Sequence, residues 1–230
     1  MKLILTCEHG GNHIPEDYSA YFNSFRDVLE THRGYDLGAL DIFKSLEPLS
    51  DYSLFSETSR LLIELNRSLY HNHLFSEASK KLSKVEKKTL IDTYYLEYRT
   101  TVENKIEQYI LNNEDAVVHL SIHSFTPILN QEERNCDIGL LYDSKKTAEK
   151  TFCSLLKKEL QANAPEIKVR FNYPYLGKAD GFTSYLRSVF HKRYLGIEIE
   201  INQKLALNNV MDENIKKLLF SSIKSVLNHY

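Results

Sequence analysis

Two histidines follow predicted strands directly, at positions where their side chains could bind a metal ion. The apolar run Lys2–Cys7 has no helical period and breaks at a Gly-Gly pair, which predicts a buried strand with His9 just beyond it. The largely apolar, β-branched run Ala116–Ile122 predicts another strand, and His123 follows it. Imidazole nitrogens are common zinc ligands, so the two side chains could share a metal site. The alternative is that backbone hydrogen bonds satisfy each histidine, since neither HExxH nor CxxC occurs in the chain.

A second set of polar side chains, around the apolar pentamer Leu61–Leu65, could bind an anion. We expect this pentamer to be a strand, with Arg60 before it and the pair Asn66 and Arg67 after it. A guanidinium group presents a planar fork that matches a carboxylate, and a neighbouring amide can donate to the same anion. The alternative for each arginine is an ordinary surface salt bridge.

Two acidic side chains alternate with apolar ones in the segment Gly196–Ile201. In a strand, residues two apart point to the same face, so we expect Glu198 and Glu200 to lie side by side. If that face is buried, the carboxylates need a metal ion or an arginine as partner. The alternative is an edge strand whose acidic face is in contact with water.

The spacing of apolar residues predicts the elements that would position these side chains. A helix over Tyr35–Leu46 carries Asp36 in its first turn, and the Lys/Glu-rich stretch Ser76–Asn112 predicts one long helix or a broken pair that serves as scaffold. We also expect a strand at Ile138–Tyr142 and helices at Thr147–Leu160 and Ile215–Leu227. Strands alternating with helices predict an α/β fold with a mixed, largely parallel sheet covered by helices on both faces. In such sheets, ligands bind beyond the carboxyl ends of the strands.

Composition excludes several other classes of protein. The chain has 230 residues, 42% of them hydrophobic, and no Pro/Gly-rich linker or repeat, so we expect one domain over residues 1–230. With 29 Lys+Arg against 31 Asp+Glu, no bulk positive charge would draw it to nucleic acid or to an anionic membrane. No apolar run is long enough for a membrane span or typical of a signal peptide. Three widely spaced cysteines favour reduced thiols and a cytoplasmic location.

Six short segments occur in an informative order along the chain. They are CEHGGNHIPE (7–16), HRGYDLGA (32–39), SRLLIELNRSL (59–69), SIHSFTP (121–127), NYPY (172–175) and GIEIEINQKL (196–205). Together they resemble the N-formylglutamate amidohydrolase family, which is similar to the zinc carboxypeptidases and aspartoacylases. The resemblance extends from about residue 5 to residue 205 and implies a zinc-carboxypeptidase or phosphorylase/hydrolase-like fold.

The resemblance also implies one zinc ion bound by His9, His123 and a third ligand. The carboxypeptidase pattern places a glutamate ligand three residues after the first histidine, but here that position is Asn12. The third ligand is then expected from another position. Asp36 is our candidate, and Glu16 and Asn12 itself are the alternatives.

The same resemblance implies roles for the remaining polar residues. Asn66 and Arg67 would hold the α-carboxylate of the substrate, with Ser124 as a further substrate contact. Arg60 would stabilise an oxyanion or a second carboxylate. Glu200 would act as general base and then as general acid.

The implied activity is zinc-dependent hydrolysis of the amide bond of a small anionic N-acyl amino acid, such as N-formylglutamate. Glu198 is the alternative base, because it lies on the same predicted face as Glu200. The chain departs from the expected IRQDL form at Asn202 and Lys204, which would alter substrate contacts. Two other functions remain open, namely hydrolysis of another N-acyl amino acid or short peptide, and non-catalytic metal or ligand binding.

Overall fold

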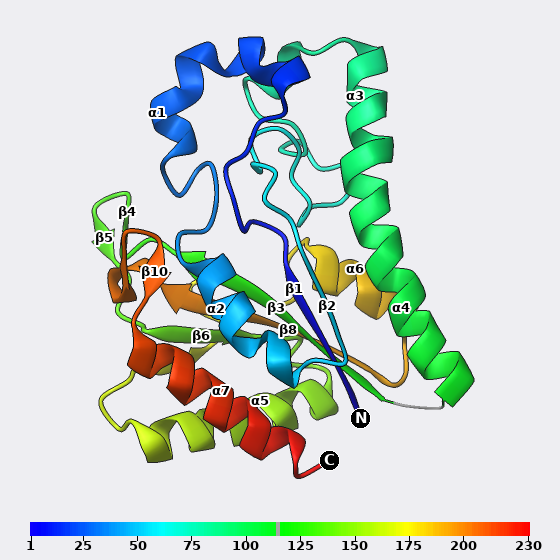
Figure 1. Ribbon diagram of the computed structural model, residues 1–230. Helices are drawn as coiled ribbons and strands as arrows, with labels where there is room; N and C mark the ends of the chain where they lie inside the picture. Colours follow the sequence, from blue (N-terminus) through cyan, green and yellow to red (C-terminus); the bar gives the residue numbers. More distant parts are fainter. Residues whose placement is uncertain (114–115) are drawn as a thin grey trace.

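The computed structural model describes residues 1–113 and 116–230. A six-stranded sheet forms its centre (Figure 1). In spatial order the strands are β2 (Tyr52–Phe55), β1 (Lys2–Cys7), β3 (Val117–Phe125), β8 (Tyr194–Asn202), β6 (Ile138–Leu141) and β7 (Val169–Phe171). The first four of these strands are parallel. β6 is antiparallel to β8 and parallel to β7. This mixed, largely parallel sheet confirms the expected fold class.

Helices cover both faces of the sheet, as expected (Figure 1). On one face, α2 (Ala39–Leu46), α5 (Thr147–Asn163) and α7 (Glu213–Leu227) pack on the strands in one hydrophobic cluster. On the other face, α6 (Phe182–Val189) and a long helix form a second cluster with the segment Leu61–Leu65. The sheet therefore separates two apolar layers, and the polar site residues lie between the sheet and the second layer.

The two-residue period of the strands selects which side chains face the second layer. Val118, Leu120 and Ile122 of β3 join the cluster with α2, α5 and α7. The alternate residues His119, Ser121 and His123 therefore point to the opposite face. β8 follows the same rule, since its isoleucines join the first cluster and its glutamates face the second layer. The expectation that Glu198 and Glu200 share a face is confirmed, but β8 is a central strand and not an edge strand.

The long helix corresponds to most of the predicted stretch Ser76–Asn112. It begins at α3 (Lys84–Leu90), because Ser83 and Glu86 form a capping box there. It continues through a π-helical segment (Ile91–Leu96) into α4 (Glu97–Asn113). Ser79–Lys81 before it forms only a short 3-10 turn.

The prediction of a strand at Leu61–Leu65 is wrong. The pentamer is buried, but it forms turns and pairs with no strand of the sheet. The strand beside β1 is instead β2, whose residues are half-buried or exposed. A short buried apolar run does not by itself distinguish a strand from an irregular segment that packs over the sheet.

One further prediction needs correction at the site. The helix expected over Tyr35–Leu46 begins only at Ala39, so Asp36 lies in the turn before α2 rather than in its first turn. That turn needs Gly38 in the left-handed region, with φ of 74°. The Gly-Gly pair after His9 is held closely, since a Cβ at Gly10 would meet the carbonyl oxygen of Ser56 at 2.9 Å.

The remaining elements are short. They are the helix α1 (Arg26–Leu29), the 3-10 helices Glu16–Phe25, Glu47–Leu49 and Gln203–Leu205, and the hairpins β4 (Ile128–Leu129) with β5 (Glu132–Glu133) and β9 (Ala206–Leu207) with β10 (Val210–Met211). All three cysteines are buried free thiols, as expected. Within residues 1–113 and 116–230, every helix is too short or too polar to cross a lipid bilayer.

Candidate active site

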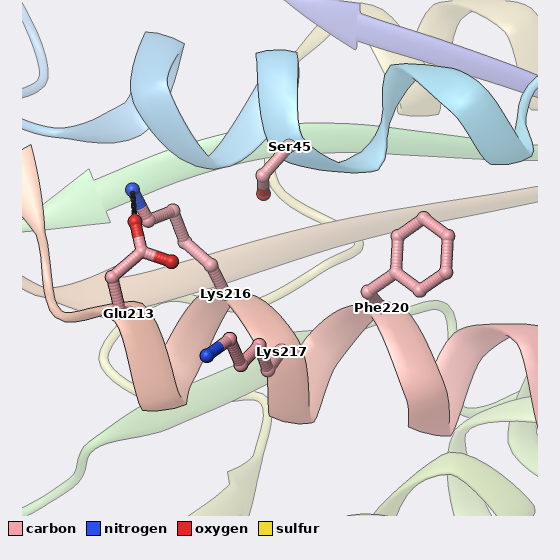
Figure 2. Close-up of a pocket in the computed structure, with 5 residues that line it drawn as sticks. All are labelled: Ser45, Glu213, Lys216, Lys217 and Phe220. Carbon is pink, nitrogen blue, oxygen red and sulfur yellow. Dashed lines mark ion pairs between the residues drawn. The ribbon is translucent and has the colours of Figure 1, made fainter.

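One cavity away from the polar strand ends carries little chemistry. It has a volume of about 270 Å³ and lies between α2 and α7, lined by Ser45, Phe220 and charged residues of α7 (Figure 2). Lys216 there is already paired with Glu213 at 2.5 Å and with Asp41 at 3.1 Å. Its remaining charged residue, Lys217, makes no ion pair or side-chain hydrogen bond among the described residues, so we place the active site elsewhere.

A second cavity, of about 190 Å³, lies beyond the carboxyl ends of β1 and β3 and against β8. It is lined by side chains from distant parts of the sequence, namely His9, Asp36, Arg60, Asn66, Arg67, His123, Ser124, Tyr175, Leu176, Ala179, Asp180, Glu198 and Glu200. The cavity therefore contains every side chain for which the sequence suggested a catalytic, substrate-binding or metal-binding role, apart from the alternatives Glu16 and Asn12.

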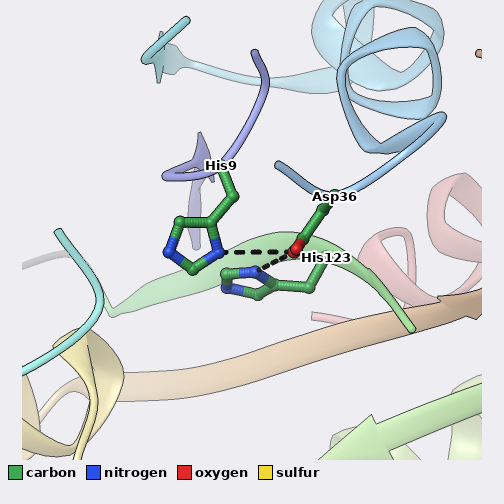
Figure 3. A group of neighbouring side chains, drawn as sticks. All are labelled: His9, Asp36 and His123. Carbon is green, nitrogen blue, oxygen red and sulfur yellow. Dashed lines mark hydrogen bonds and ion pairs between the residues drawn. The ribbon is translucent and has the colours of Figure 1, made fainter. Parts of the chain in front are cut away.

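His9, Asp36 and His123 form a compact buried cluster at this cavity (Figure 3). Their potential ligand atoms all lie within 4.8 Å of one another. The Nδ1 atom of His123 is 2.9 Å from Oδ2 of Asp36, and Nδ1 of His9 is 3.3 Å from the same oxygen. Two imidazole nitrogens and a carboxylate oxygen that converge in this way form a donor set suited to zinc.

The outer ring nitrogens of both histidines are held by carboxylates. Nε2 of His9 contacts Glu64. Nε2 of His123 lies 2.8 Å from the Ser121 hydroxyl and 3.2 Å from Oε2 of Glu8. Metal-binding histidines commonly donate their second N–H to a carboxylate, which leaves the other nitrogen free to bind the metal. The residues present therefore fit a metal ion at the Nδ1 atoms.

Glu8 is itself fixed by two hydroxyl groups. Ser121 donates to its Oε2 at 2.5 Å, and Tyr98 of α4 donates to its Oε1 at 3.2 Å. Glu8 follows β1 directly, and Ser121 pairs with Thr6 of β1 across the sheet. The parallel pairing of β1 and β3 thus brings Glu8 and Ser121 together, next to Nε2 of His123.

The buried acids and histidines of the cluster perturb one another. Burial alone would raise the pKa of Asp36, but His9 and the hydrogen bond with His123 hold this pKa well below its usual range. Burial also favours the neutral form of Glu64, yet Arg60 and His9 lower its pKa overall. For His123, burial lowers the pKa, but Asp36 and Glu8 raise it well above its usual value. The cluster thus holds ionised carboxylates that favour a bound cation.

Arg60 belongs to the support of this cluster. Its Nη1 donates to Asp36 at 3.1 Å, and its Nε donates to Glu64 at 2.8 Å. The burial of the guanidinium is outweighed by these two carboxylates, which raise the pKa of Arg60. Arg60 therefore holds two acids in place and still presents a charged surface to the cavity.

Asn66 and Arg67 line the same cavity but make different contacts. The side-chain oxygen of Asn66 accepts a 2.6 Å hydrogen bond from the backbone N–H of Phe182, and its Nδ2 is 3.3 Å from Nε2 of His123. The Arg67 guanidinium contacts the backbone carbonyl of Asp180, and no ion pair joins it to a carboxylate of the described chain. Arg67 is thus a cation of the cavity lining without a carboxylate partner in the described part of the chain.

Glu200 differs from every other acid of the site. It is 5% exposed, and within the described chain its Oε2 has no hydrogen-bond partner. Burial raises the pKa of Glu200 to about 8, with His123 opposing the rise and Asp36 adding to it. Glu198 is half-buried and accepts a 2.7 Å hydrogen bond from Thr183. A buried carboxyl with a free oxygen and a raised pKa suits proton transfer.

The other candidate residues either make hydrogen bonds within the protein or lie outside the cavity. Ser124 lines the cavity, but its hydroxyl donates to the Leu37 carbonyl and accepts from Gln203. Glu16 is exposed at the start of a 3-10 helix. Asn12 donates its amide to Leu29 and Glu30. Asp36, rather than Glu16 or Asn12, is the oxygen donor that the structure brings to the two histidines.

Sequence reasoning missed Glu8, Glu64, Ser121 and Tyr98 as parts of the site. Two of them had a detectable signal, because Glu8 adjoins His9 and Ser121 stands two residues before His123 on one strand face. Glu64 lies within a pentamer that we expected to be a strand, and Tyr98 lies in a helix that we expected to be scaffold only. Tertiary packing alone brings these two to the cluster.

Replacing Glu200 with glutamine should stabilise the metal-free protein at alkaline pH. The ordinary pKa is 4.5 and the folded-state pKa is about 8, so the unfolded chain loses its proton first as pH rises. Wild type therefore loses stability between these pH values, by a few kcal/mol at most. Urea unfolding with a chelator present should show the advantage of Glu200→Gln growing from pH 5 to pH 9. An advantage that is equal at both pH values would contradict a buried, proton-holding Glu200.

Comparison with known proteins places this chain in a family. Residues 1–207 match the family model described as N-formylglutamate amidohydrolase. The description of this family is that of a hydrolase that acts on amide bonds. The chain belongs to the N-formylglutamate amidohydrolase family, which confirms the resemblance found in the sequence.

Solved structures share the fold. The gene product Atu2144 from Agrobacterium tumefaciens matches with a TM-score of 0.80 at 24% sequence identity, over 99% of this chain and 91% of that chain. The N-formylglutamate amidohydrolase from Ralstonia eutropha JMP134 matches with a TM-score of 0.73 at 18% identity, over 99% of this chain and 93% of that chain. None of the curated proteins is significantly similar to this chain in sequence.

Proposed function

We propose that this protein is a zinc-dependent hydrolase that cleaves the amide bond of a small, anionic N-acyl amino acid, with N-formylglutamate as the first candidate. One observation carries this proposal. A single cavity of about 190 Å³ is lined by the His9, Asp36 and His123 cluster, by the partnerless carboxyl oxygen of Glu200 and by the carboxylate-free guanidinium of Arg67. These are the groups that metal-assisted hydrolysis of an anionic amide requires.

The donor set of the cluster suits zinc, and the residues around it supply the proton transfers. Bound there by His9, Asp36 and His123, zinc would polarise the scissile carbonyl and lower the pKa of a water molecule towards ~7. Glu200 accepts the proton of the attacking water at its free Oε2 and passes it to the departing amine. Glu198 is the alternative base on the same strand face, but its Oε1 already accepts the Thr183 hydroxyl.

Arg60 has a supporting role in this reaction. Its ion pairs keep Asp36 and Glu64 oriented towards the histidines. Its side chain is 27% exposed and lines the cavity, so its charge would also stabilise an oxyanion that forms at the scissile carbonyl. Ser124 lies beside His123 at the cavity wall and is a further contact for the substrate.

Arg67 binds the α-carboxylate of the substrate in this proposal. Replacing it with alanine should lower kcat/KM for N-formyl-L-glutamate at least ~30-fold, mainly through KM, because a desolvated charge pair is lost. The α-carboxamide of the same substrate should be an equally poor substrate of wild type and variant. A rate panel of N-formyl, N-acetyl and peptide derivatives, each as acid and amide, makes the comparison.

Two controls accompany the Arg67 variant. Arg67→Lys should restore the rate only in part, since an ammonium group cannot present the planar fork. Arg26→Ala removes an exposed arginine whose guanidinium donates to Asn23, outside the cavity lining, and should leave the rates unchanged. We call Arg67 in this role the carboxylate clamp. Equal rates of wild type on acids and amides would remove this clamp from the proposal.

The same rate panel separates the alternative substrates. A faster reaction with N-acetyl amino acids or short peptides would assign the site to another small amide, and no turnover with zinc present would favour a non-catalytic binding protein. The chain has no bulk positive charge, so a small anionic molecule rather than nucleic acid is the expected partner. Buried free thiols at Cys7, Cys136 and Cys153 favour a reducing compartment, and we propose the cytoplasm.

A further inference from the structure

A buried arginine of α4, Arg99, is not used by the chemistry proposed above. It is 4% exposed, and no ion pair joins it to a carboxylate of the described chain. Desolvation lowers the pKa of Arg99, which reflects the cost of burying a charge without an anion beside it. A buried charge of this kind needs hydrogen-bond acceptors or other contacts that offset its lost solvation.

The hydrogen bonds of Arg99 go to the segment that carries Arg67. Its Nη1 donates to the backbone carbonyls of Leu65 and Arg67, each at 3.1 Å. These two carbonyls stand on either side of Asn66. Tyr95, one turn earlier on the same helix, donates its hydroxyl to the Arg67 carbonyl at 2.7 Å. Two helix side chains thus hold the backbone of Arg67.

An aromatic sandwich fixes the Arg99 guanidinium. Its central carbon lies 4.8 Å from the ring centroid of Tyr95, 4.5 Å from that of Phe182 and 4.7 Å from that of Tyr185. Cation–π contacts of this kind partly replace the lost solvation of the charge. Phe182 also donates its backbone N–H to the Asn66 side chain, so one residue restrains both the arginine and the segment it holds.

A π-helical segment precedes α4 and contains Tyr95. Tyr95 lies in the π-helical segment Ile91–Leu96, and α4 begins directly after it. A π-turn inserts an extra residue into the helix and is often found at functional sites. Burial raises the pKa of Tyr95 to about 12, so its hydroxyl keeps the proton that it donates.

We propose that Tyr95 and Arg99 are positioning residues that set the direction of the Arg67 guanidinium and thereby the preference of the site for a free α-carboxylate. This inference rests on the proposed function, because it assigns the control of the carboxylate clamp to the long helix. Arg67 itself lies in an irregular segment without strand pairing. The helix supplies the rigidity that this segment lacks.

The test compares binding of L-glutamate with binding of its α-carboxamide, isoglutamine, to zinc-loaded protein by calorimetry. Both probes have a free amino group, so both lack the acylated amine that the proposed reaction cleaves. In wild type, glutamate should bind at least ~30-fold more tightly than isoglutamine. Tyr95→Phe removes only the hydroxyl and should reduce this ratio about 3-fold, whereas Arg99→Met should reduce it at least ~10-fold.

Two further variants show whether the effect passes through Arg67. Tyr109→Phe removes a hydroxyl of the same helix that donates to the carbonyl of Asp51, far from the cavity, and should keep the wild-type ratio. In the Arg67→Ala background, Arg99→Met should change the ratio no further, because coupled residues are not additive.

The outcomes separate this inference from the proposed function. A wild-type ratio that persists in Tyr95→Phe and in folded Arg99→Met overturns the positioning role and leaves the clamp standing. A parallel loss of affinity for both probes also overturns it, because it shows a purely structural role. Equal binding of both probes to wild type overturns the clamp and the inference with it.

Discussion

Glu200→Gln is expected to lower kcat by at least ~100-fold on the best N-acyl amino acid, while bound zinc and the fold remain unchanged. The reason is that Glu200 lines the cavity, its Oε2 has no hydrogen-bond partner within the described chain, and it is not one of the clustered ligands. Glutamine has the same shape but cannot accept the proton of the attacking water. Steady-state kinetics together with zinc analysis of the same preparation make the measurement.

The matched control is Glu198→Gln, two residues earlier on the same face of β8. Glu198 already accepts a hydrogen bond from Thr183, so we expect a smaller loss of kcat in this variant. A larger loss in Glu198→Gln than in Glu200→Gln would reverse the assignment of the base. Loss of zinc from Glu200→Gln would make Glu200 a ligand instead.

His9→Ala and His123→Ala should each abolish stable zinc binding. Removing one of three converging donors leaves an incomplete site, so zinc content should fall from about one per chain to below ~0.1, and activity to below ~1% of wild type. Elemental analysis of dialysed protein measures the content. Because affinity alone does not select zinc, nickel and cobalt are determined in the same samples.

His13→Ala provides the control for the metal-site variants. His13 follows His9 within the same HGGNH segment, but its side chain is exposed and lies outside the cluster. It should retain full zinc content and activity. If His9→Ala and His123→Ala also retained full occupancy, the metal site would be wrongly assigned.

The sequence allowed the strand-borne part of the site to be predicted. A strand period of two residues places His123 and Glu200 on one face, and the register pairs them directly across β3 and β8. The position of His9 just beyond β1 follows from the buried run before it. These residues could be found because the geometry of a parallel sheet is regular and local patterns reveal it.

The rest of the site depends on irregular backbone, which local patterns do not determine. Asp36 reaches the histidines from a turn before α2, where its backbone N–H donates to the carbonyl of His9. Glu64 contacts His9 because the buried pentamer Leu61–Leu65 folds over the sheet rather than joining it. Propensity could not distinguish these two outcomes, since both bury the same apolar side chains.

The long helix was expected to be only a scaffold, but its side chains also contact residues of the site. Tyr98 supports Glu8, while Tyr95 and Arg99 hold the Arg67 backbone. All three donate to groups that are far away in the sequence. Local sequence patterns cannot reveal such pairings, because each joins residues that are far apart along the chain.

Release of formate from N-formyl-L-glutamate, measured with zinc-loaded protein and with the same protein after chelation, tests the central claim most directly. The proposal predicts turnover by the zinc-loaded protein, a loss of at least ~100-fold on chelation, and recovery when zinc is restored. Unchanged turnover after complete removal of metal would contradict a metal-assisted hydrolase. The absence of turnover with zinc bound, on this and every other N-acyl amino acid of the panel, would contradict the proposed activity.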